Sequence, residues 1–146
     1  MDNINSVDKC KVMEIVLDAC AIIAVIADEP EGMEVINITQ NSIIVSPNVI
    51  SFEIVNSLTR MMKKGIIDNK EKMMDLIKSF QQIPLQLVEN DLENVLEIAW
   101  KYKIYAYDAF YLETARKLKL PLLTFDNGMR KIGKEMGITI LGGQKC

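Results

Sequence analysis

The sequence predicts one three-layer α/β domain with a mainly parallel sheet. Its 146 residues match the usual size of a single compact domain. Hydrophobic residues make up 49% and charged residues 25%, and glycine and proline are few, so the chain can bury a core and is neither disordered nor of low complexity. Short apolar runs alternate with longer segments of helical periodicity, which is typical of a parallel sheet covered on both faces.

The predicted strands are short runs of continuous apolar residues, as expected for strands that are buried on both faces. They are Met13 to Leu17, Ile43 to Val45, Leu85 to Val88, Leu122 to Phe125 and Ile138 to Leu141.

The predicted helices are the longer segments between these strands. They are Ala21 to Ala27, Glu31 to Gln40, Val49 to Lys64, Asn69 to Gln82, Leu92 to Tyr102, Asp108 to Leu118 and Asn127 to Met136. In the third of these, Ile50, Ile54 and Leu58 recur at helical spacing and so share one face. Gly65 and Gly137 follow the ends of two helices, where glycine is common.

The first residues, Met1 to Val12, are polar and unpatterned, and we predict a flexible leader followed by a single domain over residues 13–146. The longest apolar run, Ala19 to Ala27, is about half of the roughly 20 residues needed to cross a bilayer. Asp18 lies inside the only stretch that resembles a signal peptide and argues against one. We therefore expect no membrane association.

Cysteine and histidine usage limits the chemistry that the chain can perform. Cys10, Cys20 and Cys146 are an odd number without CxxC spacing, which indicates neither a disulfide framework nor a zinc site and favours a reducing cytoplasm. The chain has no histidine, which excludes Ser-His-Asp and Cys-His hydrolases and His-based zinc proteases. Catalysis would have to use carboxylates, Lys, Tyr or Cys.

The charge balance argues against a generally basic surface for nucleic acid. The formal net charge is −3. Basic residues are nevertheless grouped locally, for example in Arg116, Lys117 and Lys119 and in Arg130, Lys131 and Lys134. A solvated helix face is the simpler explanation for any one such group. A nucleic-acid role therefore has to rest on local charge.

One segment imitates a nucleotide-binding loop. Gly128 to Lys134 spells GxxxxGK after a predicted strand, which is the start of a P-loop. The next residue is Glu135, where a P-loop needs Ser or Thr to hold magnesium, and its charge would repel phosphate. We interpret the segment as a basic amphipathic helix.

Two aspartates follow predicted strands directly and precede helices. Asp18 ends the first strand and Asp126 follows Leu122 to Phe125. Ligands bind at this edge of parallel α/β sheets. Each residue also has an ordinary explanation, because Asp is a good helix N-cap and the sequence Asp126-Asn127-Gly128 is common in turns.

Two further acids are placed near helix N-termini. Asp108 opens the helix Asp108 to Leu118 and is a second candidate cap. Glu53 lies one turn into its helix, between two apolar residues, although a solvated face explains it equally well. The four acids indicate a site only when they are taken together, since the carboxyl ends of parallel strands and the starts of the following helices share one edge of the sheet.

Four carboxylates that met at this edge would need cations to stay ionised, because like charges raise one another's pKa. Mg²⁺ or Mn²⁺ prefers oxygen ligands and suits a site without histidine or thiolate. Such ions can polarise a phosphodiester, activate water and stabilise the leaving oxygen. The acids therefore indicate nuclease chemistry.

Four motifs that contain these acids resemble those of a known family. In chain order they are Asp18, Phe52-Glu53-Ile-Val-Asn56, Tyr107-Asp108-Ala-Phe-Tyr-Leu and Thr124-Phe-Asp126. This order is similar to that of PIN domains, particularly VapC-like toxins of prokaryotic toxin–antitoxin pairs. The resemblance covers about Met13 to Leu141.

The resemblance implies a metal-dependent endoribonuclease that uses Mg²⁺ or Mn²⁺, forms a homodimer and is neutralised by a VapB-like antitoxin. It assigns Asp18, Glu53, Asp108 and Asp126 to the catalytic, metal-binding quartet. Thr124, Asn56 and Asn127 are predicted to support it. Cys20 departs from the family, which commonly has Ser, Thr or Asn there, and Cys forms weaker hydrogen bonds.

Three alternatives stay open on the sequence alone. One is a domain that keeps the fold and binds metal or a partner without cleaving RNA. Another is a housekeeping RNA-processing nuclease rather than a toxin. The third is a receiver-like phosphoacceptor, but the residues that flank Asp18 and Asp126 supply neither the adjacent acids nor the lysine that such a domain needs.

Overall fold

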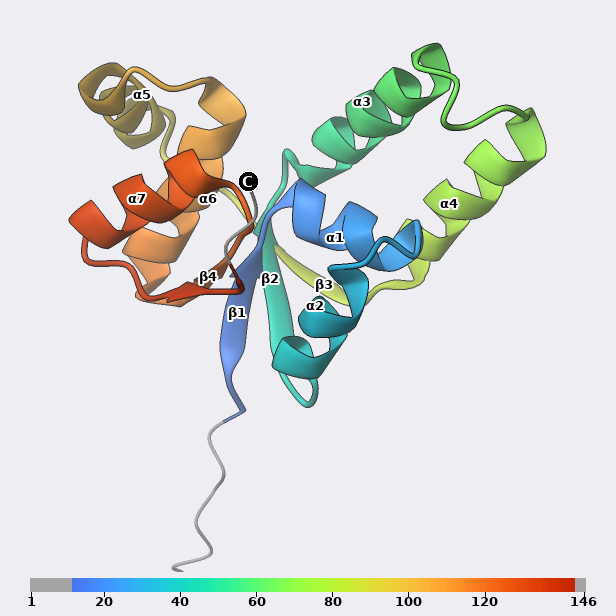
Figure 1. Cartoon of the computed structure of the whole chain (residues 1–146). Coiled ribbons are helices and arrows are strands. Elements are labelled where there is room, and N and C mark those ends of the chain that lie inside the picture. Colours follow the sequence, from blue (N-terminus) through green and yellow to red (C-terminus); the bar gives the residue numbers. More distant parts are fainter. Residues whose placement is uncertain (1–11, 144–146) are drawn as a thin grey trace, which may run out of the picture.

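In a computed structural model, residues 12–143 form a parallel five-stranded sheet between two layers of helices (Figure 1). The strand order is β3-β2-β1-β4-β5, and every neighbouring pair is parallel. The three-layer α/β prediction is therefore confirmed. Most of the predicted leader, together with Cys10 and Cys146, lies outside the described residues.

The bounds of the elements stay close to the sequence-based expectations. The strands are β1 Glu14–Leu17, β2 Ile43–Pro47, β3 Leu85–Val88, β4 Leu122–Leu123 and β5 Ile140–Leu141. The helices are α1 Ala19–Ile26, α2 Gly32–Thr39, α3 Ile50–Lys63, α4 Lys70–Gln82, α5 Leu92–Tyr102, α6 Ala106–Leu118 and α7 Asn127–Glu135.

Each face of the sheet has its own helices. Helices α1 to α4 lie on one side, and α5 to α7 lie on the other (Figure 1). Helix α6 packs across β1, β2 and β4, with α5 and α7 packed against α6. The chain order explains why the helices are divided between the two faces. After β3 the chain has to pass back across β2 and β1 to reach β4, and it does so on the other face of the sheet.

The central strand determines where a site can form. β1 pairs with β2 on one side and with β4 on the other, so the strand order reverses at β1. In open parallel sheets, such a reversal leaves a crevice at the carboxyl ends of the strands. Asp18 and Asp126, which follow β1 and β4, lie at this crevice.

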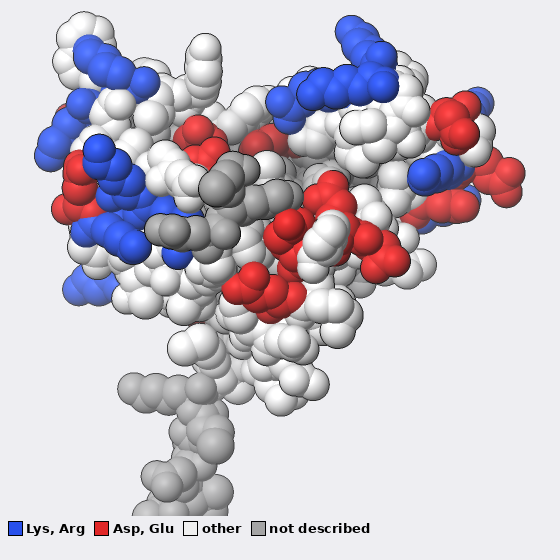
Figure 2. Space-filling view, viewed as in Figure 1, with Lys and Arg blue, Asp and Glu red and all other residues white. Residues whose placement is uncertain are grey.

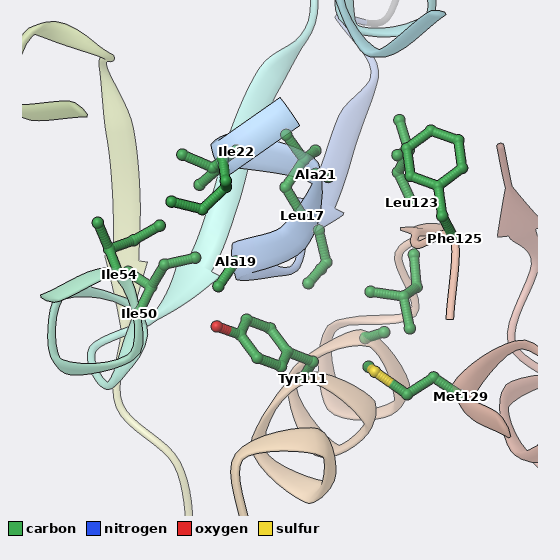
Figure 3. Packing of buried hydrophobic residues seen from close by; sticks show 14 of the residues in the cluster. Leu17, Ala19, Ala21, Ile22, Ile50, Ile54, Tyr111, Leu123, Phe125 and Met129 are labelled. Atoms are coloured by element: carbon green, nitrogen blue, oxygen red, sulfur yellow. The ribbon is translucent and has the colours of Figure 1, made fainter. Parts of the chain in front are cut away.

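The core is built on β1. Ile15, Val16 and Leu17 are almost completely buried, and on the α6 side Tyr111 and Leu112 are equally inaccessible. Figure 3 shows the ring of Tyr111 between the helix that carries Ile50 and Ile54 and the side chain of Met129. Burial on both faces explains why the central strands β1 and β4 read as apolar runs rather than as alternating patterns.

Two helices begin earlier than the sequence predicted. Helix α1 starts at Ala19 rather than Ala21, because Asp18 caps it directly. Helix α6 starts at Ala106 rather than Asp108, with Tyr105 in the capping position. The interpretation of Asp108 as a cap is therefore wrong, and its carboxylate lies in the first turn of the helix.

The GxxxxGK segment is not a phosphate-binding loop. Both of its glycines lie within α7. A Cβ added at Gly133 would approach Ile140 Cδ1 to 2.5 Å, so this glycine permits close packing of α7 on β5. The structure agrees with the amphipathic helix predicted there.

Across residues 12–143, the structure contains no helix with the length and apolar character needed to cross a membrane. Cys20 is a free thiol.

Candidate active site

Four acids are carried by the starts of four helices at the carboxyl edge of the sheet. Asp18 caps α1 and Asp126 caps α7, while Glu53 and Asp108 lie in the first turns of α3 and α6. Helix N-termini carry partial positive charge, which favours carboxylates there. Each acid thus lies where the partial charge of a helix N-terminus offsets part of the cost of its negative charge.

Asp18 is the most buried of the four, with a relative exposure of 3%. Its Oδ1 accepts a hydrogen bond from the backbone N–H of Ala21 at 2.9 Å. Its Oδ2 accepts one from the Thr124 hydroxyl at 2.5 Å. Asp18 therefore caps α1 as predicted, but the cap uses only one of its two carboxylate oxygens.

Thr124 connects the ends of β1 and β4. Besides donating to Asp18, its Oγ1 accepts a hydrogen bond from the backbone N–H of Asp126 at 3.1 Å. Asp126 Oδ1 in turn accepts from the N–H of Met129 at 2.8 Å, while the residue is exposed. One buried hydroxyl therefore fixes both strand-end acids.

Glu53 is oriented by a partner that the sequence reasoning missed. The hydroxyl of Tyr111 donates to Glu53 Oε2 at 2.6 Å. The Tyr111 hydroxyl points toward the helix that carries Ile50 and Ile54 (Figure 3). The available signal was the spacing of three residues from Asp108 to Tyr111, which places both on one face of α6.

Burial and mutual repulsion raise the pKa values of three of these acids. Desolvation is the main cause for Asp18, whose pKa rises to about 6, and Glu53 and Asp126 add to the rise. Desolvation followed by Asp108 raises the pKa of Glu53 against the lowering effect of the Tyr111 hydrogen bond. Desolvation followed by Asp126 raises the pKa of Asp108.

These interactions join the four acids into one electrostatic group. Asp18 interacts with Glu53 and Asp126, and Asp108 interacts with the same two residues. Figure 2 shows acidic side chains in the hollow between the two helical layers, with basic side chains over α3 and α7. A cation at this position would relieve the repulsion.

The chemistry of the four side chains suits a hard divalent ion, but three of them are not spaced to share one ion. All four are carboxylates, which Mg²⁺ and Mn²⁺ prefer. Among residues 12–143, no three Asp, Glu, Cys or His side chains are arranged to share one metal ion. An ion held by one or two of these carboxylates together with water needs no rearrangement, whereas an ion shared by three of them requires the carboxylates to move closer together.

The predicted supporting residues differ in their placement. Thr124 is at the centre of the site, whereas Asn56 and Asn127 are exposed beside it on α3 and α7.

Cys20, beside the acids, reaches the surface. Desolvation of its thiol, followed by the charges of Asp18, Glu53 and Asp126, raises the Cys20 pKa to about 12. Cys20 is therefore a neutral thiol at neutral pH and not a nucleophile.

Three residues of the basic groups singled out in the sequence make contacts within the fold. Arg116 forms an ion pair with buried Glu113, and Lys117 donates to the carbonyl of Glu89. Arg130 donates to the carbonyls of Thr124 and Leu141, which joins α7 to the ends of β4 and β5.

Comparison with known families identifies the fold. A model described as PIN domain matches residues 15–135. The chain belongs to the PIN domain family. The match spans every element from β1 to α7 and all four acids.

Individual relatives agree with this assignment. "Ribonuclease VapC3" from Pyrobaculum aerophilum is 25% identical over 118 residues, covering 78% of this chain and 90% of the relative. The crystal structure of PAE2754 from the same organism matches with a TM-score of 0.67 at 22% identity, covering 88% of this chain and 83% of that one. VapBC2 from Rickettsia felis, bound to a promoter DNA fragment, matches with a TM-score of 0.64 at 13% identity, covering 88% and 98%. The two structures establish similarity of fold.

The raised pKa of Asp18 predicts a specific dependence of stability on pH in metal-free protein. The folded state holds this proton more tightly than the unfolded state, so Asp18 destabilises the fold as pH rises from about 4 through about 6. Asp18→Asn keeps the cap and removes this charge. We expect the variant to be more stable by about 1 to 2 kcal/mol near neutral pH.

Urea unfolding in EDTA across this pH range measures the effect. The difference between Asp18→Asn and wild type should grow as pH rises from about 4 through about 6, because only wild type has to ionise Asp18, and the relief of repulsion on Glu53 and Asp126 in the variant acts in the same direction. A difference that stays constant with pH would show that Asp18 is not an ionised, desolvated acid.

Tyr111→Phe tests how Glu53 is held. The hydrogen bond lowers the pKa of Glu53, so its loss should raise that pKa further and cost about 1 to 2 kcal/mol of stability. Carboxyl NMR titration of metal-free protein reports the first effect and urea unfolding the second. Tyr102→Phe in α5 is the control, and a Glu53 pKa equal in wild type and Tyr111→Phe would contradict the assignment.

Proposed function

We propose that the chain is a metal-dependent endoribonuclease that hydrolyses RNA phosphodiester bonds. The observation that carries the proposal is the group of four interacting acids at the strand-order reversal of a PIN fold. Three of them have raised pKa values with identifiable causes, which is typical of functional sites. The name of the Pyrobaculum relative supports ribonuclease activity.

The proposed roles follow from the surroundings of each residue. Asp18, Glu53, Asp108 and Asp126 would hold Mg²⁺ or Mn²⁺. The bound ion would activate water and stabilise the charge on the scissile phosphate.

The chain's own residues orient that site. Thr124 fixes the carboxylate of Asp18, and Tyr111 fixes that of Glu53, so two of the acids are positioned before any ion binds. Asp126 is exposed and therefore accessible to substrate.

The biological setting is proposed on the same basis. The VapC name of the relative and the VapBC assembly of a structural neighbour support the role of a toxin with a VapB-like antitoxin. We propose that the protein acts in the cytoplasm, which agrees with the free thiol of Cys20. An antitoxin-like reading frame beside the gene would favour the toxin over a housekeeping nuclease.

The competing functions are less well supported. A receiver-like phosphoacceptor needs an accessible aspartate, but Asp18 is buried and each of its oxygens accepts a hydrogen bond. A domain that only binds a partner has no need for four acids that destabilise one another.

Replacing one acid decides whether the site cleaves RNA. Asp108→Asn should lower manganese-dependent cleavage of defined RNAs by more than the roughly 10- to 100-fold typical of changes around a metal site. Asp75→Asn, on exposed α4, is the control and should cleave as wild type does. Cleavage by Asp108→Asn at the wild-type rate, or undiminished cleavage in EDTA, would reject the metal-nuclease mechanism.

A homodimer is also proposed. The two aliphatic helices over residues 21–27 and 31–40 are one source of apolar surface for it: most of α1 is buried, but Met33 and Ile36 of α2 are exposed. Exposed apolar residues also form a stripe on α5, at Leu92, Leu96 and Trp100. Such a stripe is typical of a contact between copies.

Light scattering tests this pairing. We expect a mass of about twice 16.5 kDa for wild type, because association would bury the α5 stripe. Leu96→Glu should give the single-chain mass, whereas Met74→Glu on α4 should not alter the mass. A single-chain mass for wild type over a wide concentration range would exclude the dimer.

A further inference from the structure

Gly142 and Gly143, which follow β5, lie against the segment that carries Asp126, and we call these two residues the strap. The backbone of Gly142 has a φ of +97°, a left-handed conformation that glycine adopts easily. A Cβ added there would approach the carbonyl oxygen of Thr124 to 3.3 Å and the ring of Phe125 to 3.4 Å. The strap therefore packs directly on the two residues that precede Asp126.

The strap is held from the opposite helical layer. The backbone N–H of Gly143 donates a hydrogen bond to Glu34 Oε1 at 2.7 Å. Glu34 belongs to α2, which lies on the other side of the sheet from α7 (Figure 1). The contact spans 109 residues of sequence and joins the two helical layers beyond the carboxyl end of β5.

Arg130 attaches the same region from within. It donates to the carbonyls of Thr124 at 2.9 Å and of Leu141 at 3.2 Å, which ties α7 to the ends of β4 and β5. Strand β5, helix α7 and the strap thus form one edge unit, and Asp126 is its capping residue. Phe125 and Asp126 also line a pocket of about 580 Å³ between α1, α3 and the segment that follows β4, so the edge unit forms part of the wall of this pocket.

Asp126 needs a tie of this kind more than Asp18 does. Asp18 follows the central strand β1, whereas Asp126 begins a helix at the edge of the sheet. The ionised carboxylates of Asp18 and Asp108 both repel that of Asp126. In metal-free protein this repulsion pushes the edge unit outward, and an attachment to α2 opposes it.

We propose that Glu34 is a positioning residue for Asp126. By holding the strap from α2, it keeps the edge unit closed on β4, so that the Asp126 carboxylate stays within the group of four acids. The consequence for metal binding rests on the proposed function, whereas the closure of the edge unit does not.

Amide hydrogen exchange in EDTA tests the closure directly. The N–H of Leu122 donates to the carbonyl of Thr139, beside β5, and the N–H of Val16 donates to that of Pro121, beside β4. Glu34→Ala removes the acceptor for the strap, so the Leu122 amide should exchange about fivefold faster, the effect of one lost hydrogen bond. The Val16 amide should exchange at the wild-type rate, because the centre of the sheet stays paired.

Three further variants separate the hydrogen bond from other effects. Glu34→Gln keeps an oxygen that can accept from the strap and should leave Leu122 exchange as in wild type. Asn37→Ala, on the exposed surface of α2, should also leave it unchanged. Gly142→Ala strains the backbone and crowds the Thr124 carbonyl, and should accelerate Leu122 exchange although Glu34 is intact.

Added Mg²⁺ tests whether the closed edge unit holds Asp126 for a metal ion. If opening of the edge unit withdraws one carboxylate from a bound ion, Mg²⁺ at ten times its Kd should slow Leu122 exchange about tenfold in wild type. Asp126→Asn keeps a good helix cap but removes the charge, and Mg²⁺ should then leave Leu122 exchange unchanged.

The outcomes distinguish this inference from the ribonuclease function. Equal acceleration of the Leu122 and Val16 amides by Glu34→Ala, or no acceleration of either, would overturn the inference while manganese-dependent cleavage remains a separate measurement. Leu122 exchange that Mg²⁺ does not slow in wild type would overturn the positioning role of Glu34. Selective effects of Glu34→Ala and of Mg²⁺ in a protein that cleaves no RNA would instead reject the nuclease and keep the role of Glu34.

Discussion

The hydrogen bonds of Thr124 hold the site together. Its buried hydroxyl donates to the carboxylate that follows β1 and accepts from the backbone N–H of the acid that follows β4. These two strands are neighbours only because the strand order reverses at β1. The reversal creates the crevice, and the threonine fixes the two acids at its base. The acids on α3 and α6 are then brought in by helices that start at the same edge.

This arrangement is unfavourable for the protein without a ligand. Burial and like charges raise the pKa values of three acids, so their ionised forms reduce stability near neutral pH. Helix N-termini and the hydroxyls of Thr124 and Tyr111 offset part of this cost, but they do not neutralise the group. A divalent ion would reduce this negative charge, so ion binding would relieve the repulsion between the acids and allow a phosphate to approach them.

The sequence was informative wherever one local signal decided the structure. Continuous apolar runs located all five strands, and placement after a strand located Asp18 and Asp126. Helix starts were less accurate. The cap at Asp18 was recognised but not used to begin α1 at Ala19, and Tyr105, in the capping position of α6, makes no side-chain capping hydrogen bond. Local sequence signals could not reveal the role of Tyr111 or the pocket between α1, α3 and the segment that follows β4. The contact of Tyr111 with Glu53 spans 58 residues, and the pocket combines segments from three regions of the chain. Such features depend on packing that no local pattern records.

The short strands at the end of the chain have a consequence for motion. β4 and β5 have two residues each, and α7 is attached to them through Arg130 and through the close approach at Gly133. Strand β5 and helix α7 lie at the edge of the sheet, and edge elements open locally at a lower free energy than the buried centre, to which Leu122 and Leu123 of β4 belong. Asp126 caps α7, whereas Asp18 follows β1 in the middle of the sheet. Transient detachment of the edge would withdraw one acid while the rest of the sheet stays folded, and would give product a way to leave.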